Sequence, residues 1–124
     1  TQARESKPSR ILILDTIGAL KYAYRFGMIA YVGGGFTGRL HNVLEPAAYG
    51  IPVIIGPKTR RFPEAAIMKE KQMLKTIEYH ASSLKEAVGW FSKEENRRTC
   101  QLNGEKFFFS NLHAAKTVIK GIKL

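Results

Sequence analysis

Two groups of residues in the middle of the chain could together form a site for a phosphate-bearing ligand. Gly33, Gly34 and Gly35 follow an apolar segment, and Asn42 and Glu45 stand shortly after them at the start of an expected helix. Glycines let the backbone approach an anion closely, and the first turn of a helix directs unpaired N–H groups and a positive dipole end toward the same place. The combination predicts a nucleotide or sugar-phosphate site.

The same residues also have a purely structural interpretation. Asn42-x-x-Glu45 fits a capping box, in which the Asn42 side chain accepts an N–H and Glu45 reaches back. Capping does not account for the three glycines, nor for Pro46, which stands where the first intrahelical N–H bond would be lost. We therefore favour a ligand site whose capping residues also contact the ligand.

A predicted strand–helix–strand unit over residues 31–57 positions these groups. The first strand covers residues 28–32, a short helix covers residues 41–49 and ends at Gly50, and the second strand covers residues 52–55. Lys58, Arg60 and Arg61 follow the second strand directly. Because open α/β sheets bind ligands at the carboxyl ends of their strands, we expect these three cations near the anion.

The residues before this unit predict one more strand and a helix. Residues 10–15, RILILD, are typical of a buried parallel strand that ends in the carboxylate of Asp15. A short helix is expected over residues 20–26, with Gly27 at its C-cap. Asp15 and Thr16 either cap that helix or line the same cleft as the glycines, and both interpretations remain open.

The residues after the unit predict an amphipathic helix over 62–74, a short strand over 76–79 and three further helices. Capping boxes at Ser83-x-x-Glu86 and Ser92-x-x-Glu95 are expected to begin helices that reach Phe91 and about Phe109, and residues 111–122 form the last helix. The three phenylalanines at 107–109 are expected to pack against the sheet. The alternation of elements predicts an α/β fold, a Rossmann-like parallel sheet with helices on both faces.

Composition limits the classes of function. The 124 residues carry 20 Lys and Arg against 10 Asp and Glu, a formal charge of +10, and such a field attracts phosphates, nucleic acid or anionic membrane. The single cysteine excludes a disulfide framework and a cysteine-based zinc site. No run approaches the roughly 18 apolar residues that a membrane span needs, and no signal peptide opens the sequence. We expect an intracellular chain with a polar tail or linker over residues 1–10, one domain over residues 11–124, and an origin in a longer protein.

Two other classes of function compete for the glycine segment. Gly33-x-Gly35-x-x-Gly38 matches the dinucleotide fingerprint. The expected helix does not begin within the glycines, however, and no acidic residue follows about 20 residues later to bind a ribose. Of this class only an NADP-binding site that uses Lys58 and Arg60 remains open. The charge alone would suit a nucleic-acid-binding module, yet the chain shows none of the motifs of that class.

A third class rests on a family resemblance. The segments DTIGAL (15–20) and YVGGGFTGRLHNVLEPAAYGIPVIIGP (31–57), followed by Phe62 and Glu64, closely resemble the C-terminal half of 3-deoxy-D-manno-octulosonic acid (Kdo) transferases. These enzymes attach Kdo to lipid A in lipopolysaccharide biosynthesis. The resemblance covers about half the chain, and the HN-x-LEP string after a glycine turn is its most specific part.

The resemblance implies the second Rossmann-like domain of a GT-B glycosyltransferase, which binds the donor CMP-Kdo and needs neither a metal nor another cofactor. It implies an inverting transfer, a general base and the contacts to the lipid A precursor on an absent N-terminal domain, and a full-length enzyme on the cytoplasmic face of the bacterial inner membrane, docked on anionic lipid. The fragment itself is expected to be soluble, inactive alone and without nucleic acid. The donor-binding residues that the resemblance implies are Ile17, Gly18, Ala19, Gly34, Gly35, His41, Asn42, Val43, Leu44 and Glu45.

The chain departs from the family pattern at three places. Ala19 replaces the usual Glu, Arg39 and Leu40 replace the Gly-Gly that commonly precedes His-Asn, and Lys58 stands where many members have His. Such changes fit either a divergent branch or a different donor. Within the implied site, Glu45 would accept hydrogen bonds from the ribose hydroxyls and backbone N–H groups from about Val43 would meet the phosphate.

Overall fold

The sheet at the centre of the molecule has three parallel strands. The computed structural model describes the backbone of residues 9–122 and the side chains up to Ser110. Strands β1 (Ala30–Tyr31), β2 (Val53–Ile55) and β3 (Leu74–Thr76) lie in the order β1-β2-β3, so that β2 is central. The register pairs Ala30 with Val53 and Val53 with Leu74. This architecture confirms the predicted α/β class with a parallel sheet.

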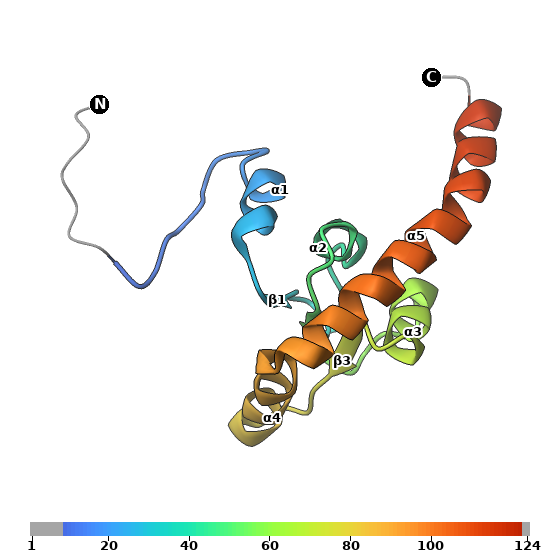
Figure 1. Ribbon diagram of the computed structural model, residues 1–124. Coiled ribbons are helices and arrows are strands. Elements are labelled where there is room, and N and C mark those ends of the chain that lie inside the picture. Colours follow the sequence, from blue (N-terminus) through green and yellow to red (C-terminus); the bar gives the residue numbers. More distant parts are fainter. Residues whose placement is uncertain (1–8, 123–124) are drawn as a thin grey trace.

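The predicted strand over residues 10–15 does not form, and this part of the sequence prediction was wrong. Ile11, Leu12 and Ile13 are 76%, 81% and 81% exposed, and the segment extends away from the sheet in Figure 1. A parallel strand needs at least one neighbouring strand to bond with, and none of the described residues pairs with this segment. The hydrophobic pattern alone could not show that this neighbour is missing.

Three helices cover one face of the sheet. Val53 and Ile55 of β2 point to this face, where they pack in one core cluster with residues of α2 (Leu44–Ala48), α3 (Pro63–Glu70) and α5 (Glu94–Ile122). Both strand-to-strand crossovers, through α2 and through α3, thus lie on the same side of the sheet. Cys100 is buried on this face and its Sγ contacts the carbonyl oxygen of Met73 at 3.9 Å.

Helix α4 (Ala81–Ser92) covers the opposite face of the sheet. Ile54 alternates with its strand neighbours and packs there against Ala87 and Phe91 of α4 and against Ile77. The expectation of helices on both faces of the sheet is therefore confirmed. Tyr31 lies on the same face as Ile54 by register but is 51% exposed. The cover on this face is thus incomplete over β1.

Two predicted boundaries between α3 and β3 were displaced. The helix predicted over 62–74 ends at Glu70, because Gln72 takes a left-handed conformation (φ 59°) and turns the chain into the strand. Leu74 consequently belongs to β3 and is 2% exposed, while Ile77, predicted in the strand, follows it. Left-handed residues other than glycine are uncommon, so the sequence carried no signal for the turn.

Neither predicted capping box begins a helix. His80 is the N-cap of α4, and its Nδ1 accepts the N–H of Ser83 at 3.2 Å. Ser83 instead uses its Oγ to accept the N–H of Glu78, and Ser92 donates its hydroxyl to the carbonyl oxygen of Val88 in the preceding turn. Hydroxyl groups that bond backward along a helix do not cap the next one.

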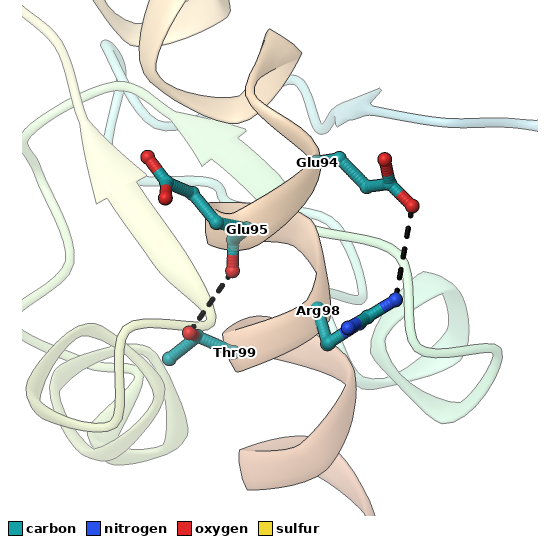
Figure 2. A network of polar contacts seen from close by, with 4 residues as sticks. All are labelled: Glu94, Glu95, Arg98 and Thr99. Atoms are coloured by element: carbon teal, nitrogen blue, oxygen red, sulfur yellow. Dashed lines mark hydrogen bonds and ion pairs between the residues drawn. The ribbon is translucent and has the colours of Figure 1, made fainter.

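Helix α5 is one continuous element where two were expected. It runs from Glu94 to Ile122 and crosses the sheet obliquely in Figure 1. Figure 2 shows its first turns, where Arg98 lies 3.8 Å from Glu94 and the Thr99 hydroxyl donates to the carbonyl oxygen of Glu95. Phe107 is buried as predicted and Phe108 packs partly against the core, but Phe109 is 82% exposed and does not reach the sheet.

The short helix before β1 forms at the predicted place. It comprises α1 (Leu20–Ala23) and the 3-10 turn η1 (Tyr24–Phe26), with Gly27 as the C-cap. Its N-cap is Ala19, with no side-chain cap, so the interpretation of Asp15 and Thr16 as caps was wrong.

Candidate functional site

The glycine segment folds into a tight loop at the carboxyl end of β1. The carbonyl oxygen of Gly34 accepts the N–H groups of Thr37 (3.2 Å) and Arg39 (3.0 Å), and the Thr37 hydroxyl also donates to it. The carbonyl oxygen of Gly33 accepts the N–H of His41 at 3.0 Å. The loop is thus closed by its own backbone, and this closure carries the chain directly to the segment 41–45.

Glycine is required at two of these positions by the fold itself. Gly34 has φ +92°, and a Cβ there would lie 1.9 Å from the carbonyl oxygen of Arg39. A Cβ on Gly35 would lie 2.6 Å from the backbone nitrogen of Gly56, which begins the loop after β2. The structure therefore corrects the argument that only a ligand accounts for the glycines, because close backbone contact already does.

The start of α2 differs from the predicted capping box. Asn42 Oδ1 accepts the N–H of Leu44 at 2.9 Å, while Val43 takes the N-cap position without a side-chain cap. Pro46 consequently lies in the first turn, and the first backbone bond is the one from Ala47 N–H to the carbonyl oxygen of Val43, at 3.4 Å. The expected loss of a hydrogen bond at Pro46 was therefore wrong, since proline is tolerated in the first turn.

The predicted contact residues 41–45 differ in their access to solvent. His41 and Asn42 are exposed, Leu44 and Glu45 are half-buried, and Val43 is 1% exposed within the core. A ligand at this segment would meet the two exposed polar side chains and Glu45. Val43 supports the segment from below by packing in the core cluster.

Glu45 faces the short helix that precedes β1. Burial, and after it the negative charge of Glu45, raises the pKa of the Tyr24 hydroxyl above its usual value. The rings of Tyr24 and Tyr49 lie 6.2 Å apart, so η1 and the end of α2 meet at this point. The half-buried Glu45 in α2 is thus near enough to η1 to act on the Tyr24 hydroxyl.

The segment Ile17, Gly18 and Ala19 lies apart from the glycine loop in the bonding pattern. Ile17 is fully exposed, Gly18 has φ +87° in open space, and Ala19 begins α1. Across the described chain, no hydrogen bond joins these residues to residues 33–45. The structure therefore groups seven of the ten predicted donor-binding residues and leaves these three separate.

A basic pocket lies beside the glycine loop at the carboxyl ends of β1 and β2. The two loops are joined there by the hydrogen bond from Lys58 N–H to the carbonyl oxygen of Gly35, at 2.7 Å. The pocket has a volume of about 630 Å³. Its lining residues come from both loops: Thr37, Gly38, Arg39, Pro57, Lys58, Thr59, Arg60 and Arg61.

The position of this pocket confirms that Lys58, Arg60 and Arg61 lie next to the glycine loop. Sequence reasoning noted Arg39 only as a departure from the family pattern and missed it as the fourth cation. The sequence carried no signal for this position, because only the turn of the loop back on itself brings residue 39 opposite the loop after β2.

The dinucleotide interpretation loses support from the same geometry. Gly38 has φ +76° in the loop, and α2 begins only at Leu44, so the helix does not open within the glycine pattern.

Within the described residues, no group of three His, Cys, Asp or Glu side chains is arranged to hold a metal ion. No helix among these residues is both long and apolar enough to cross a bilayer.

Comparison with curated proteins finds relatives that are transferases by name. The chain is 41% identical over 69 residues to the 3-deoxy-D-manno-octulosonic acid transferase of Aquifex aeolicus, and 29% identical over 126 residues to that of Haemophilus influenzae. The matches cover 55% and 99% of the chain, but only 20% and 30% of these relatives. A bifunctional glycosyltransferase/methyltransferase of Fusobacterium nucleatum is 30% identical over 112 residues, which is 89% of the chain and 17% of that protein.

No family model and no solved structure matches the chain. By their names these relatives are glycosyltransferases, and the chain is thus similar in sequence to part of a glycosyltransferase. Within that class the chain resembles a portion of the Kdo transferases, which confirms the resemblance predicted from its sequence.

Proposed function

We propose that this chain is the donor-binding half of a Kdo transferase. In this proposal it binds CMP-Kdo within a two-domain GT-B enzyme that attaches Kdo to lipid A in lipopolysaccharide biosynthesis. The transfer inverts the anomeric centre and uses no metal or cofactor besides the donor. The general base and the lipid A precursor belong to an N-terminal domain, and the full-length enzyme lies at the cytoplasmic face of the inner membrane.

One observation supports the proposal most strongly. In a chain that resembles Kdo transferases, the HN-x-LEP segment is held against the glycine loop by the bond from His41 N–H to the carbonyl oxygen of Gly33. The HN-x-LEP segment and the glycine loop both lie at the carboxyl edge of a parallel sheet, where α/β proteins bind their ligands. His41, Asn42 and Glu45 supply a ring, an amide and a carboxylate there.

Each of these groups has a role in the proposed donor complex. Glu45 accepts hydrogen bonds from the ribose hydroxyls, since an ionised carboxylate is an acceptor only. The side chains of His41 and Asn42 contact the nucleotide from the solvent side. The full enzyme removes the proton of the acceptor hydroxyl with a base on its other domain, and this half stabilises the leaving phosphate electrostatically.

Nucleotide titration of the 15N-labelled chain tests the proposal. CMP, UMP and NADP are added separately, and the backbone amide shifts of residues 33–45 are followed by NMR. We expect CMP to shift the amides of His41, Asn42 and Glu45, and UMP and NADP to have smaller effects. A response to NADP without one to CMP would rule out the Kdo transferase proposal in favour of a dinucleotide site.

A transferase for another nucleotide sugar is the alternative. The relative from Fusobacterium nucleatum supports it, because that protein is named only as a glycosyltransferase and methyltransferase and matches most of the chain. In the same titration this alternative predicts that UMP, or another uridine or guanosine nucleotide, shifts residues 41–45 more strongly than CMP does.

A further inference from the structure

Among the residues that the structure describes, no acidic side chain pairs with the four cations of the basic pocket. The pocket lining contains no acidic residue. Among the described residues, the ion pair between Arg98 and Glu94 on α5 (Figure 2) is the only one, and neither residue lines this pocket. Four positive charges that share one hollow repel each other, so their gathering at a ligand-binding edge of the sheet indicates an anionic occupant.

The backbone fixes the places from which these cations extend. Arg39 is held by the bond from its N–H to the carbonyl oxygen of Gly34, and Lys58 by its 2.7 Å bond to Gly35. The turn that carries Arg60 and Arg61 is closed by Phe62 N–H on the carbonyl oxygen of Thr59, at 2.9 Å. The close contact of Gly35 with Gly56 keeps the two loops together. The pocket is therefore a part of the fold rather than a chance meeting of long side chains.

We propose that this basic pocket binds the carboxylate of the sugar acid that the donor carries. This inference rests on the proposed function. The relatives transfer a sugar whose name is that of an acid, so its activated form brings two anionic groups, the nucleotide phosphate and the sugar carboxylate. The proposed function places the nucleotide at residues 41–45, and the adjoining pocket takes the second anion.

The residue types suit a carboxylate. The planar guanidinium groups of Arg39, Arg60 and Arg61 present paired donors that match the two oxygens of a carboxylate, and Lys58 adds a point charge. Among the described residues, no carboxylate pairs with the cations of the pocket, whereas the N–H of Leu44 at the start of α2 is already bonded to Asn42. The pocket thus selects sugar acids against neutral sugars.

Free Kdo, its methyl ester and inorganic phosphate are the three probes that test this inference on the labelled chain. We expect free Kdo to shift the amides of residues 37–39 and 58–61, and the neutral ester to leave them in place. In a variant that combines Arg60→Gln and Arg61→Gln, affinity for Kdo should fall roughly tenfold, the effect of losing about one charge-assisted hydrogen bond. A variant that combines Lys85→Gln and Arg98→Gln is the charge-matched control, since these residues lie on α4 and α5 outside the pocket lining, and it should leave Kdo binding unchanged.

Equal shifts from the ester and the free acid would overturn the inference, as would the absence of any shift in the pocket. Binding of phosphate in preference to Kdo would also overturn it and would assign the pocket to a phosphate group. The CMP titration separates the two proposals: shifts at residues 41–45 with a silent pocket leave the proposed function standing alone, whereas a Kdo response without a CMP response contradicts the nucleotide site.

Discussion

Gly35 and Gly56 pack backbone against backbone where the loops after β1 and β2 meet. A Cβ on Gly35 would lie 2.6 Å from the Gly56 nitrogen, and a Cβ on Gly56 would lie 2.6 Å from the Gly35 carbonyl carbon. This contact holds the glycine loop beside the basic pocket, so that both candidate binding surfaces depend on it.

Replacement of either glycine by alanine should destabilise the fold. Gly35→Ala forces the two loops apart, and we expect a loss of about 2–4 kcal/mol in the free energy of unfolding, measured in urea. Gly89→Ala is the matched control, because a Cβ at this position in the interior of α4 would have nothing within 4 Å. That variant should gain about 0.5–1 kcal/mol. Equal stability of Gly35→Ala and the unchanged chain would contradict the close packing.

Truncation of Glu45 should weaken nucleotide binding. Glu45→Ala removes the proposed acceptor for the ribose hydroxyls, and the expected loss is that of a hydrogen bond to a charged group, about 1.5–3 kcal/mol. Glu86→Ala on the exposed side of α4 changes the net charge equally and should not alter CMP affinity. Calorimetry or NMR titration with CMP measures the affinity of both variants. Unchanged affinity in Glu45→Ala would leave Glu45 with only a structural place at the start of α2.

The cap of α4 should be sensitive to its histidine. His80→Ala removes the acceptor of the Ser83 N–H, and loss of an N-cap costs about 1 kcal/mol. His80→Asp supplies a carboxylate oxygen as the acceptor in place of Nδ1 and should restore most of that stability. Ser92→Ala should change stability by less than about 0.5 kcal/mol, because Ser92 does not cap α5. Thermal unfolding monitored by circular dichroism compares the three variants, and a larger effect at Ser92 than at His80 would overturn the assignment.

Alkaline pH should destabilise the fold through Cys100. Burial raises the pKa of this thiol from 9.0 to about 11. The unfolded chain therefore loses its thiol proton at lower pH than the folded chain does, and stability falls as the pH rises from about 9 through about 11. Cys100→Ala should remove this part of the pH dependence, and the raised pKa of Tyr24 leaves a remaining slope of the same sign. Urea midpoints at several alkaline pH values measure the difference, and identical slopes in the two proteins would exclude a raised thiol pKa.

The sequence predicted the centre of the fold because its signals there are local. Apolar runs and glycines identified β1, β2 and the loop between them, and the rule that parallel strands share one carboxyl edge brought Lys58, Arg60 and Arg61 to that loop. The family resemblance came from the same stretch of residues. Arg39 was missed because its position depends on how the loop turns back, which charge and spacing do not reveal.

The errors fall where the outcome depends on distant or unusual contacts. Residues 10–15 have the composition of a buried strand, yet a strand forms only where another strand pairs with it. The left-handed Gln72 ended α3 early, and His80 displaced the serine that fitted a capping motif. At residue 110 the serine hydroxyl bonds back to the carbonyl oxygen of Lys106, and the helix passes through a position predicted to be a break.

The exposed segment Ile11–Leu14 makes measurements on this chain sensitive to the protein concentration, because it favours self-association. Its aliphatic side chains face water, and β1 has β2 as its only neighbour in the described sheet. An open strand edge and an apolar extended segment are surfaces through which molecules pair with one another. Sedimentation at several protein concentrations therefore belongs beside each titration, because dimer formation at this edge would shift amide signals of β1 that adjoin the glycine loop without any ligand present.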